Sequence, residues 1–226
     1  MFPSGPLDSN FIIQTANTIG FVGGIGSGKS AVARAFGERH RLPVLDADKF
    51  GHDALHLESV KSSLRNVFGD SVFQTVDGTQ QVDRSALGRV VFNEREEAKR
   101  YRKQLEAIVH PVIRERIGDQ IAALSRQPHP PSMIVIDAAV MLETGWSRNC
   151  DRIVFVDATE QIRKQRVKTN RDWTEDEWRR REQNQWPLDR KRDAADIVIS
   201  NNGELSHAVD ELERKLELAA CGPAEI

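Results

Sequence analysis

The stretch Gly23–Ser30, with the sequence GGIGSGKS, constrains the fold of this chain more than any other feature. It has the P-loop spacing G-x-x-x-x-G-K-[ST], follows the β-prone run Ile19–Val22 and precedes a helical pattern over Lys29–Glu38. Glycines in the loop allow positive φ angles that turn several N–H groups inward, so the loop can bind an anion. The following helix points its positive dipole end at the same place. A glycine-rich turn without a ligand, the alternative, does not require Lys-Ser directly at a helix start.

This loop predicts a site for the phosphates of ATP. Lys29 is expected to reach the β- and γ-phosphates, and the Ser30 hydroxyl is expected to ligate the Mg²⁺ that bridges them. The residues expected to surround the nucleotide are Gly24, Ile25, Gly26, Ser27, Gly28, Lys29, Ser30 and Ala31. ATP and Mg²⁺ are therefore the predicted ligands.

The composition of the 226 residues fits one compact α/β domain. With 39% hydrophobic residues and a formal net charge of -2, no global field favours nucleic acid or an anionic membrane, and we expect neither as a partner. Cys150 and Cys221 lie far apart, which favours a reducing compartment over a disulfide scaffold. No run approaches the roughly 18 apolar residues of a membrane span. We expect a cytoplasmic protein, with residues 1–17 as a lead-in that lacks the basic residues of a secretory signal.

Short apolar runs alternate with helical stretches along the chain. The runs cover residues 18–22, 43–46, 133–137, 152–156 and 197–199. Each is too short for a helix, and continuous apolarity is typical of parallel strands that are covered on both faces. The pattern predicts a three-layer α/β fold with a five-stranded parallel sheet. Ligands of such sheets bind beyond the carboxyl ends of the strands, so the residues that follow each strand are the informative ones.

A long segment, residues 47–132, separates the second and third predicted strands and indicates an insertion. Within it, Asp77-Gly78 predicts a turn or small hairpin. Asn93 with Glu96 predicts a capping-box start for a helical region that extends to about Leu124. His110-Pro111 is expected to end one helix and to open another.

Two carboxylates, Asp46 and Asp48, follow the second predicted strand. Phosphoryl transfer to an alcohol needs a carboxylate within hydrogen-bond reach of the attacking hydroxyl, and this edge of the sheet is the right neighbourhood. Asp46 could equally be the N-cap of the next helix. Asp48 is harder to explain as a cap and is the favoured base.

The third predicted strand ends in Asp137, in the apolar-run-then-Asp form of a Walker B element. Its carboxylate is expected to hold Mg²⁺ directly or through water. Apolar strands that end in Asp are common, so this assignment depends on the P-loop. Glu143 is expected to line the acceptor pocket, with a helix cap or a solvated side chain as the alternative.

Residues 163–192 form a basic segment after the fourth predicted strand. The segment holds eleven Lys or Arg (163, 164, 166, 168, 171, 179, 180, 181, 190, 191, 192) against six acids (172, 175, 176, 177, 182, 189). A kinase without an arginine supplied by a partner needs its own, on a lid that closes over the phosphates. A solvated charged helix is the alternative for most of these arginines.

Thr174 and Glu177 predict a capping box for a lid helix over about residues 175–185, with Arg181 and Gln185 on one face. Tryptophans at 173, 178 and 186 could stack bases in an RNA-binding protein. Their spacing favours docking of the lid onto the body of the protein.

With these residues assembled, the chain resembles the dephospho-CoA kinase family over about residues 18–215. The motifs that carry the resemblance are Gly23–Ser30, Leu45–Asp48, Phe68-Gly69 with Asp77-Gly78, Arg84–Gly88, Leu105–Pro111, Met141–Glu143, Arg181 with Gln185, and Ala195-Asp196 through Asn201–Gly203. The resemblance implies a P-loop kinase-like fold with a helical substrate-binding insertion and a lid. It also implies ATP-dependent phosphorylation of the ribose 3′-hydroxyl of dephospho-CoA, the last step of coenzyme A biosynthesis.

The resemblance also assigns residues and segments. Asp48 matches the family's catalytic acidic residue, Lys29 and Ser30 match its ATP and Mg²⁺ groups, and His110 and Arg114 match positions expected near the acceptor. Glu143 and Arg181 are also expected to bind the substrate. A single kinase domain is expected over residues 18–220. Its core would comprise 18–58, 132–169 and 193–220, with a CoA-binding helical insertion at about 59–131 and the lid at about 170–192.

Two departures from the family pattern bear on the site. The stretch Ala139–Glu143 lacks the proline that fixes a turn in the family. Gapless matching from Arg166 places Asn170 where the family has an arginine, so either Arg171 takes over after a one-residue shift or the lid chemistry is altered. We assign the catalytic lid role to Arg171.

Other functions remain open from the sequence. They are a P-loop kinase for another small alcohol or nucleotide, a P-loop NTPase that acts on RNA or a protein partner, and a pseudoenzyme that only binds nucleotide. A monomer or weak homo-oligomer is expected.

Overall fold

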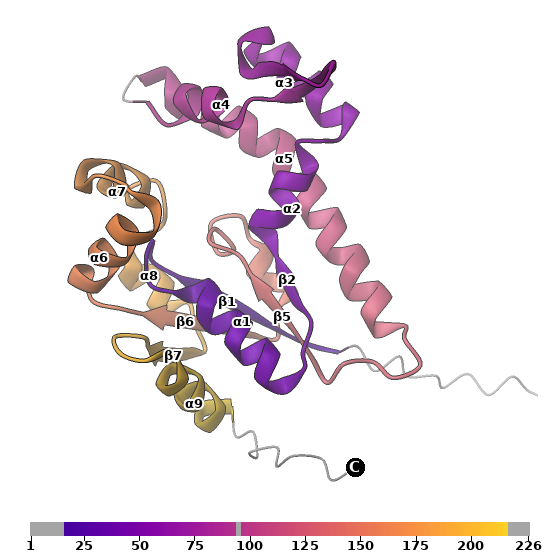
Figure 1. Ribbon diagram of the computed structural model, residues 1–226. Coiled ribbons are helices and arrows are strands. Elements are labelled where there is room, and N and C mark those ends of the chain that lie inside the picture. Colours follow the sequence, from indigo (N-terminus) through magenta and orange to yellow (C-terminus); the bar gives the residue numbers. More distant parts are fainter. Residues whose placement is uncertain (1–15, 94–95, 217–226) are drawn as a thin grey trace, which may run out of the picture.

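A five-stranded parallel sheet, in the order β2-β5-β1-β6-β7, forms the centre of the computed structural model, which describes residues 16–93 and 96–216 (Figure 1). The strands are β1 (Asn17–Gly23), β2 (Val44–Asp46), β5 (Met133–Asp137), β6 (Arg152–Asp157) and β7 (Ile197–Ser200). All five predicted strands are confirmed, each within one residue of its expected bounds.

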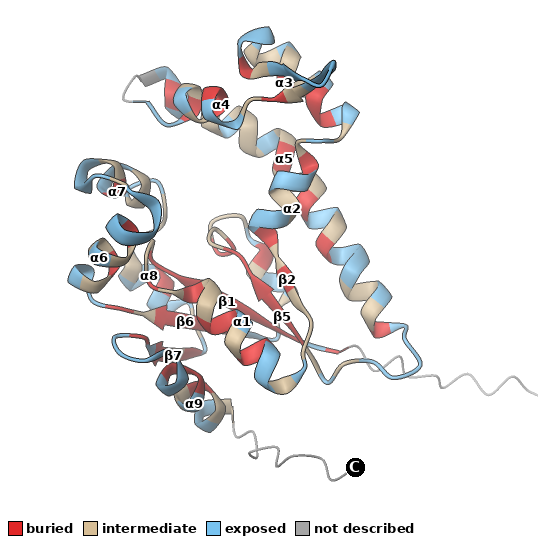
Figure 2. Cartoon of the chain, in the orientation of Figure 1, coloured by how far each residue is buried: buried red, intermediate tan, exposed pale blue. Residues whose placement is uncertain are grey.

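Helices cover both faces of this sheet, as the continuous apolar strands predicted. Helices α1 (Lys29–His40) and α9 (Leu205–Leu216) pack on one face, where they meet Phe21 and Val154. Helix α5 (Glu96–Ser125) and the short α8 (Leu188–Asp193) lie on the other, where Val22 and Phe155 point because successive strand residues alternate in direction. Figure 2 shows the central strands of this sheet as mostly buried. The fold is therefore the expected three-layer sandwich.

The insertion between β2 and β5 builds a second, smaller core away from the sheet (Figure 1). Its elements are α2 (Ala47–Ala54), α3 (Glu58–Phe68), the 3₁₀ turn η1 (Asp70–Val72), β3 (Phe73–Val76), β4 (Thr79–Val82) and α4 (Arg84–Val91). The small core contains Val60, Leu64, Val72, Val82, Leu87 and Val91. The predicted hairpin is confirmed, since Asp77 and Gly78 join antiparallel β3 and β4 with φ angles of 49° and 74°. The predicted capping box at Asn93 and Glu96 spans residues 94–95, which lie outside those described, so it stays a prediction.

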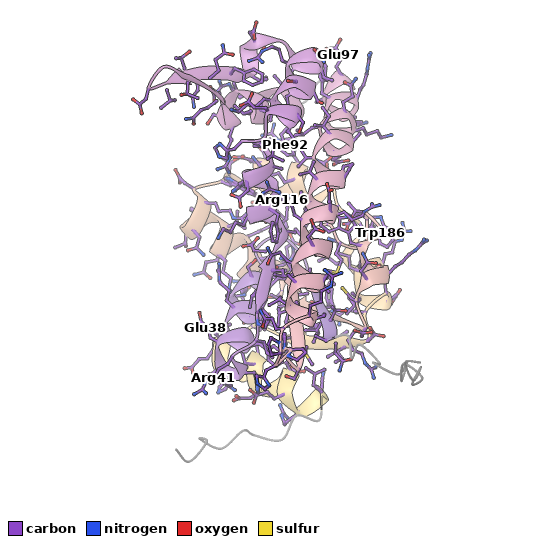
Figure 3. The ribbon with its side chains drawn as sticks, turned by 90° about the vertical axis from the view of Figure 1, so that its right-hand side faces the viewer. Glu38, Arg41, Phe92, Glu97, Arg116 and Trp186 are labelled. Carbon is purple, nitrogen blue, oxygen red and sulfur yellow. The ribbon has the colours of Figure 1, made fainter. Side chains whose placement is uncertain are left out.

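Helix α5 is continuous, so the expectation that His110-Pro111 ends one helix and opens another is wrong. Pro111 has no N–H to donate to the preceding turn, which costs one backbone hydrogen bond. Val109, Ile113 and Ile117 lie on the same side of the helix and are buried in the main core, and this packing holds the two halves in line. The 30 residues span about 45 Å. Figure 3 shows α5 running from Glu97 at the top of the molecule past Arg116 toward the sheet.

The predicted lid consists of the end of α6 (Glu160–Arg171), helix α7 (Glu175–Glu182) and α8. Outside the lid, a 3₁₀ turn, η2 (Trp146–Asn149), precedes β6. The Thr174 half of the capping box expected for α7 is confirmed, because the Thr174 side chain accepts a hydrogen bond from the Glu177 N–H. The Glu177 carboxylate accepts from Arg181. Helix α7 ends at Glu182, however, so Gln185 lies beyond it rather than on its face. Within residues 16–93 and 96–216, no helix combines the length and the apolarity needed to cross a bilayer.

Candidate active site

The ends of β1, β2 and β5 bring the P-loop and two aspartates to one edge of the sheet. Asp137 is in register with Asp46 on one side and with Phe21, two residues before the loop, on the other. The carboxyl edge of a parallel sheet is where doubly wound folds bind ligands. The predicted donor-side residues are thus brought together.

Side chains from distant segments hold the P-loop from outside. The Ser27 carbonyl accepts hydrogen bonds from Arg166 Nη1 at 3.0 Å and from Asn201 Nδ2 at 2.7 Å. The backbone of Gly28 turns at a φ of 83°, and a Cβ there would overlap the amide nitrogen of Asn201. A carbonyl held outward leaves the loop N–H groups free to face an anion. Asn201 belongs to the Asn201–Gly203 motif, which did not indicate from the sequence that this side chain holds the P-loop.

The second held carbonyl belongs to Ile25. It accepts hydrogen bonds from Trp178 Nε1 at 3.3 Å and from Arg163 Nη1 at 3.4 Å. Trp178 is the buried residue of α7, at 3% exposure, so the docking role expected for this tryptophan is confirmed. Through Trp178, helix α7 therefore contacts the phosphate loop itself.

Lys29, the P-loop lysine, is buried and forms an ion pair with Asp137, which is also buried. Burial lowers the pKa of Lys29 to about 8, while the charges of Asp48 and then Asp46 act in the opposite direction. The charges of Lys191 and Arg171 lower the pKa further. Residues from β2–α2, α6 and α8 therefore share an electrostatic environment with the P-loop lysine.

The ammonium of Lys29 lies between the Ser30 hydroxyl and the Asp137 carboxylate. Lys29 Nζ is 3.5 Å from Ser30 Oγ and contacts the Asp137 carboxylate. A hydroxyl and a carboxylate are oxygen ligands of the kind that Mg²⁺ takes alongside phosphate oxygens and water. In the described part of the chain, no group of three or more His, Cys, Asp or Glu is arranged to hold a metal by itself. The donor set thus fits a metal shared with a nucleotide, not a dedicated protein cage.

The two aspartates after β2 have different surroundings. Asp46 is the N-cap of α2, and its Oδ1 accepts a hydrogen bond from the Lys49 N–H at 3.1 Å, as the alternative interpretation expected. Asp48 lies in the first turn of the helix and is exposed. Because capping occupies Asp46, Asp48 is the better candidate to meet an incoming hydroxyl.

The lid arginines gather around Trp173. The guanidinium of Arg181 lies 4.0 Å from the centre of this ring and 4.8 Å from that of Phe92, and Arg171 lies 4.9 Å from Trp173. Phe92 follows α4, so Arg181 joins the lid to the insertion. Asn170 is exposed. Of the neighbours Asn170 and Arg171, only Arg171 carries a charge, and this charge lowers the pKa of the P-loop lysine, Lys29.

A fully buried lysine fixes the base of the lid. Lys191 of α8 donates to the Ala139 carbonyl at 3.1 Å and to Gln185 Oε1 at 2.9 Å, and it pairs with Glu143 at 2.9 Å. Glu143 also accepts a hydrogen bond from the Trp186 N–H at 2.9 Å. Sequence reasoning treated Lys191 only as one charge of a basic run. The structure gives Glu143 a contact with the lid, and its expected place in the acceptor pocket stays a prediction.

His110 and Arg114 lie on the part of α5 that faces η2. The His110 ring meets Trp146 edge-on with 6.0 Å between ring centres, and burial, followed by the charge of Arg114, lowers the pKa of His110. Arg114 and Trp146 line a cavity of about 10 Å³, room for roughly one water molecule. The roles of both residues toward an acceptor stay predictions.

Comparison with known proteins identifies the family. The profile of dephospho-CoA kinase matches residues 17–207. The chain belongs to the dephospho-CoA kinase family. The dephospho-CoA kinase of Parasynechococcus marenigrum is 38% identical over 197 residues, which cover 87% of this chain and 93% of that protein. That of Geobacillus kaustophilus is 37% identical, over 82% and 88% of the two chains.

Two solved structures share the fold. A Thermus thermophilus protein, TT1252, is 31% identical and superposes with a TM-score of 0.73, over 91% of this chain and 100% of that one. The dephospho-CoA kinase of Campylobacter jejuni, 21% identical, shares the fold with a TM-score of 0.62, over 89% and 96% of the two chains. Membership in the dephospho-CoA kinase family makes the protein a P-loop kinase, an ATP-dependent transferase with an alcohol acceptor.

Proposed function

We propose that this protein transfers the γ-phosphoryl group of ATP to the ribose 3′-hydroxyl of dephospho-CoA and so produces CoA and ADP. Family membership supports the substrate, since the relatives matched over most of their length carry this name. The observation that carries the mechanism is the ion pair of the P-loop lysine, Lys29, with Asp137 at the carboxyl edge of the sheet, the edge at which Asp48 follows β2. The charges of Asp48 and Arg171 both act on the pKa of Lys29. An acceptor-side carboxylate and a lid cation are what phosphoryl transfer to an alcohol requires.

In the proposed reaction, the loop backbone of residues 24–31 binds the phosphates and Lys29 contacts their β- and γ-oxygens. The 3′-oxygen forms a bond to the γ-phosphorus as its proton passes to the Asp48 carboxylate, and the bond from that phosphorus to the β–γ bridging oxygen breaks. Arg171 offsets the negative charge on the transferring group. Lys29 has to exchange its contact with Asp137 for one with the phosphates when ATP binds.

Ser30 and Asp137 are the residues proposed to hold Mg²⁺. Both touch the position that the Lys29 ammonium occupies, so departure of Lys29 toward the phosphates would free a cation site between them. Bound there, Mg²⁺ would neutralise charge on the β- and γ-phosphate oxygens.

The acceptor is proposed to lie between the insertion, residues 59–131, and the lid, residues 170–192, with the remaining segments as the nucleotide-binding core. Contact between Arg181 and Phe92 supports this placement, because it joins the two regions. His110, Arg114, Glu143 and Arg181 are the proposed acceptor-side residues. A cytoplasmic monomer or weak homo-oligomer, without nucleic-acid or membrane partners, also stays a prediction.

A coupled assay of ADP release tests the function. Purified protein with ATP and Mg²⁺ is expected to turn over when dephospho-CoA is added. CoA is the matched control, because it differs from dephospho-CoA only in carrying a phosphate on the 3′-oxygen and so has no hydroxyl to attack. Turnover with dephospho-CoA that does not exceed turnover with water would refute the proposal. A faster reaction with another small alcohol or nucleotide would reassign the acceptor within the P-loop kinases.

A further inference from the structure

We propose that Trp178 and Arg163 are positioning residues of the P-loop, and that lid helix α7 acts through them on the affinity for ATP. The inference goes beyond the reaction proposed above but rests on the same nucleotide site. It assigns a function to a lid tryptophan that the phosphoryl-transfer chemistry does not use.

The peptide group between Ile25 and Gly26 carries the carbonyl that these two side chains hold. In a planar trans peptide the carbonyl and the N–H point in opposite directions. Trp178 Nε1 and Arg163 Nη1 both donate to the Ile25 carbonyl from outside the loop, at 3.3 and 3.4 Å. The Gly26 N–H is thereby aimed to the opposite side, where the phosphates would lie.

This peptide needs such support because Gly26 can rotate easily. Its φ is 85°, and a glycine has several accessible backbone conformations of similar energy. Rotation of the Ile25–Gly26 peptide would turn a carbonyl oxygen toward the phosphates and remove one N–H donor. The two side-chain hydrogen bonds oppose that rotation.

Arg163 links the same peptide to the lid a second time. Its side chain is 4% exposed, lies 5.1 Å from the centre of the Trp178 ring, and forms an ion pair with Glu182 at the end of α7. A Cβ at Gly24 would approach Arg163 Nη1 to 2.9 Å, so the loop also fits closely around this guanidinium. Arg163 is therefore held between the P-loop and α7.

The two held carbonyls differ in what holds them. Ser27 O is bound by Arg166 of α6 and by Asn201 after β7, both outside the predicted lid. Ile25 O is bound by Trp178 from α7 and by Arg163, which α7 contacts through Glu182. A displacement of α7 would therefore release the Ile25–Gly26 peptide while leaving the Ser27–Gly28 peptide fixed.

The test is Trp178→Phe, which keeps an aromatic ring in the buried position and removes the indole N–H. Titration calorimetry with a non-hydrolysable ATP analogue and Mg²⁺ is expected to give a Kd about 3- to 10-fold higher than that of the unchanged protein, the scale of one lost hydrogen bond. The KM for ATP should rise equally, while the KM for dephospho-CoA and the thermal midpoint should stay near their original values. Trp186→Phe is the matched control, since the Trp186 contact with Glu143 uses the backbone N–H.

A second variant, Glu182→Gln, weakens the hold of α7 on Arg163 and leaves the tryptophan in place. It is expected to raise the Kd for the ATP analogue in the same direction. An unchanged Kd in Trp178→Phe would overturn the proposal. Equal increases in the KM values for ATP and dephospho-CoA, together with a lower thermal midpoint, would also overturn it, because they indicate a general loosening of the lid. Failure of the unchanged protein to turn over dephospho-CoA while it still binds the analogue would instead refute the proposed acceptor.

Discussion

The phosphate loop and the insertion hold their polar groups in different ways. At the loop, two backbone carbonyls accept four side-chain hydrogen bonds, and Lys29 and Asp137 are buried together. On the insertion, ion pairs such as Arg65–Asp70 lie at the surface, and only a small separate core supports the helices (Figure 2). Preorganised dipoles cost no reorganisation during reaction, which favours a rigid donor side. A large acceptor can instead be bound by a surface that adjusts to it.

The lid shares features with both the phosphate loop and the insertion. Its base is fixed by buried Lys191 and its helix by buried Trp178, whereas Arg181 reaches the insertion through the exposed ring of Phe92. We therefore expect substitutions where the lid meets the core to change stability or activity strongly, and substitutions on the insertion to change them little.

Lys191→Met is expected to give the largest loss of stability, about 3–5 kcal/mol, because it leaves the partly buried Glu143 carboxylate without its cation. Urea unfolding followed by tryptophan fluorescence measures the loss. Asp70→Asn, which removes an exposed ion pair on the insertion, is the matched variant and should cost less than about 1 kcal/mol. Similar losses for the two variants would remove the distinction between the regions. The double variant Lys191→Met/Glu143→Gln should recover part of the loss.

Asp48→Asn is expected to lower kcat by at least about 10²-fold, the usual scale for loss of a general base. Its carboxylate is exposed and makes no cap hydrogen bond in α2, so stability should change little. Calorimetry with an ATP analogue should show nearly unchanged binding, because the donor side is built without this side chain. An unchanged kcat would remove Asp48 from the role of base and shift attention to Asp46.

Two glycine substitutions compare the donor side with the insertion directly. Gly28→Ala places a side chain at a φ of 83° and against Asn201, which should cost about 1–3 kcal/mol and weaken ATP binding. Gly118→Ala, in the interior of α5 with nothing but its own stretch of helix within 4 Å of the new Cβ, should stabilise the protein by about 1 kcal/mol. Thermal unfolding with and without an ATP analogue measures both. Destabilisation of equal size would mean that α5 is as constrained as the loop.

Much of the fold was predictable because its signals are local. Five continuous apolar runs predicted the strands, and Asp77-Gly78 predicted a hairpin whose turn needs two positive φ angles. The continuity of α5 through Pro111 was missed, since burial of Val109 and Ile113 in the main core outweighs the local effect of the proline. The lid helix ends at Glu182, earlier than the predicted end at about residue 185.

The site was predictable only where a motif fixes a residue's position. The P-loop spacing located Lys29, and the end of an apolar strand located Asp137, which the structure brings into contact with it. The partners Asn201 with Ser27 and Lys191 with Glu143 join residues far apart in the chain, and neither pairing leaves a pattern in the sequence. The catalytic role of Arg171 stays a prediction. The charge of Arg171 lowers the pKa of Lys29, which indicates that the two residues are near each other and gives no contact with a phosphate.

The smallest predicted effect concerns the pH dependence of stability at His110 on α5. Burial and the charge of Arg114 lower the pKa of His110, so the folded protein binds a proton less readily at this site than the unfolded chain does. As pH falls below the unfolded value of about 6.5, the unfolded state takes up the proton first, and stability decreases until the folded pKa is passed. His110→Gln should therefore make the free energy of unfolding depend less on pH between about 7 and 5. Urea titrations at several pH values measure this slope, and His129→Gln, in an exposed loop, should leave the slope unchanged. A steeper dependence of the free energy of unfolding on pH in His110→Gln would mean that the folded protein favours the charged imidazolium of His110. The acceptor side would then hold a cation within the fold, as the donor side does at Lys29.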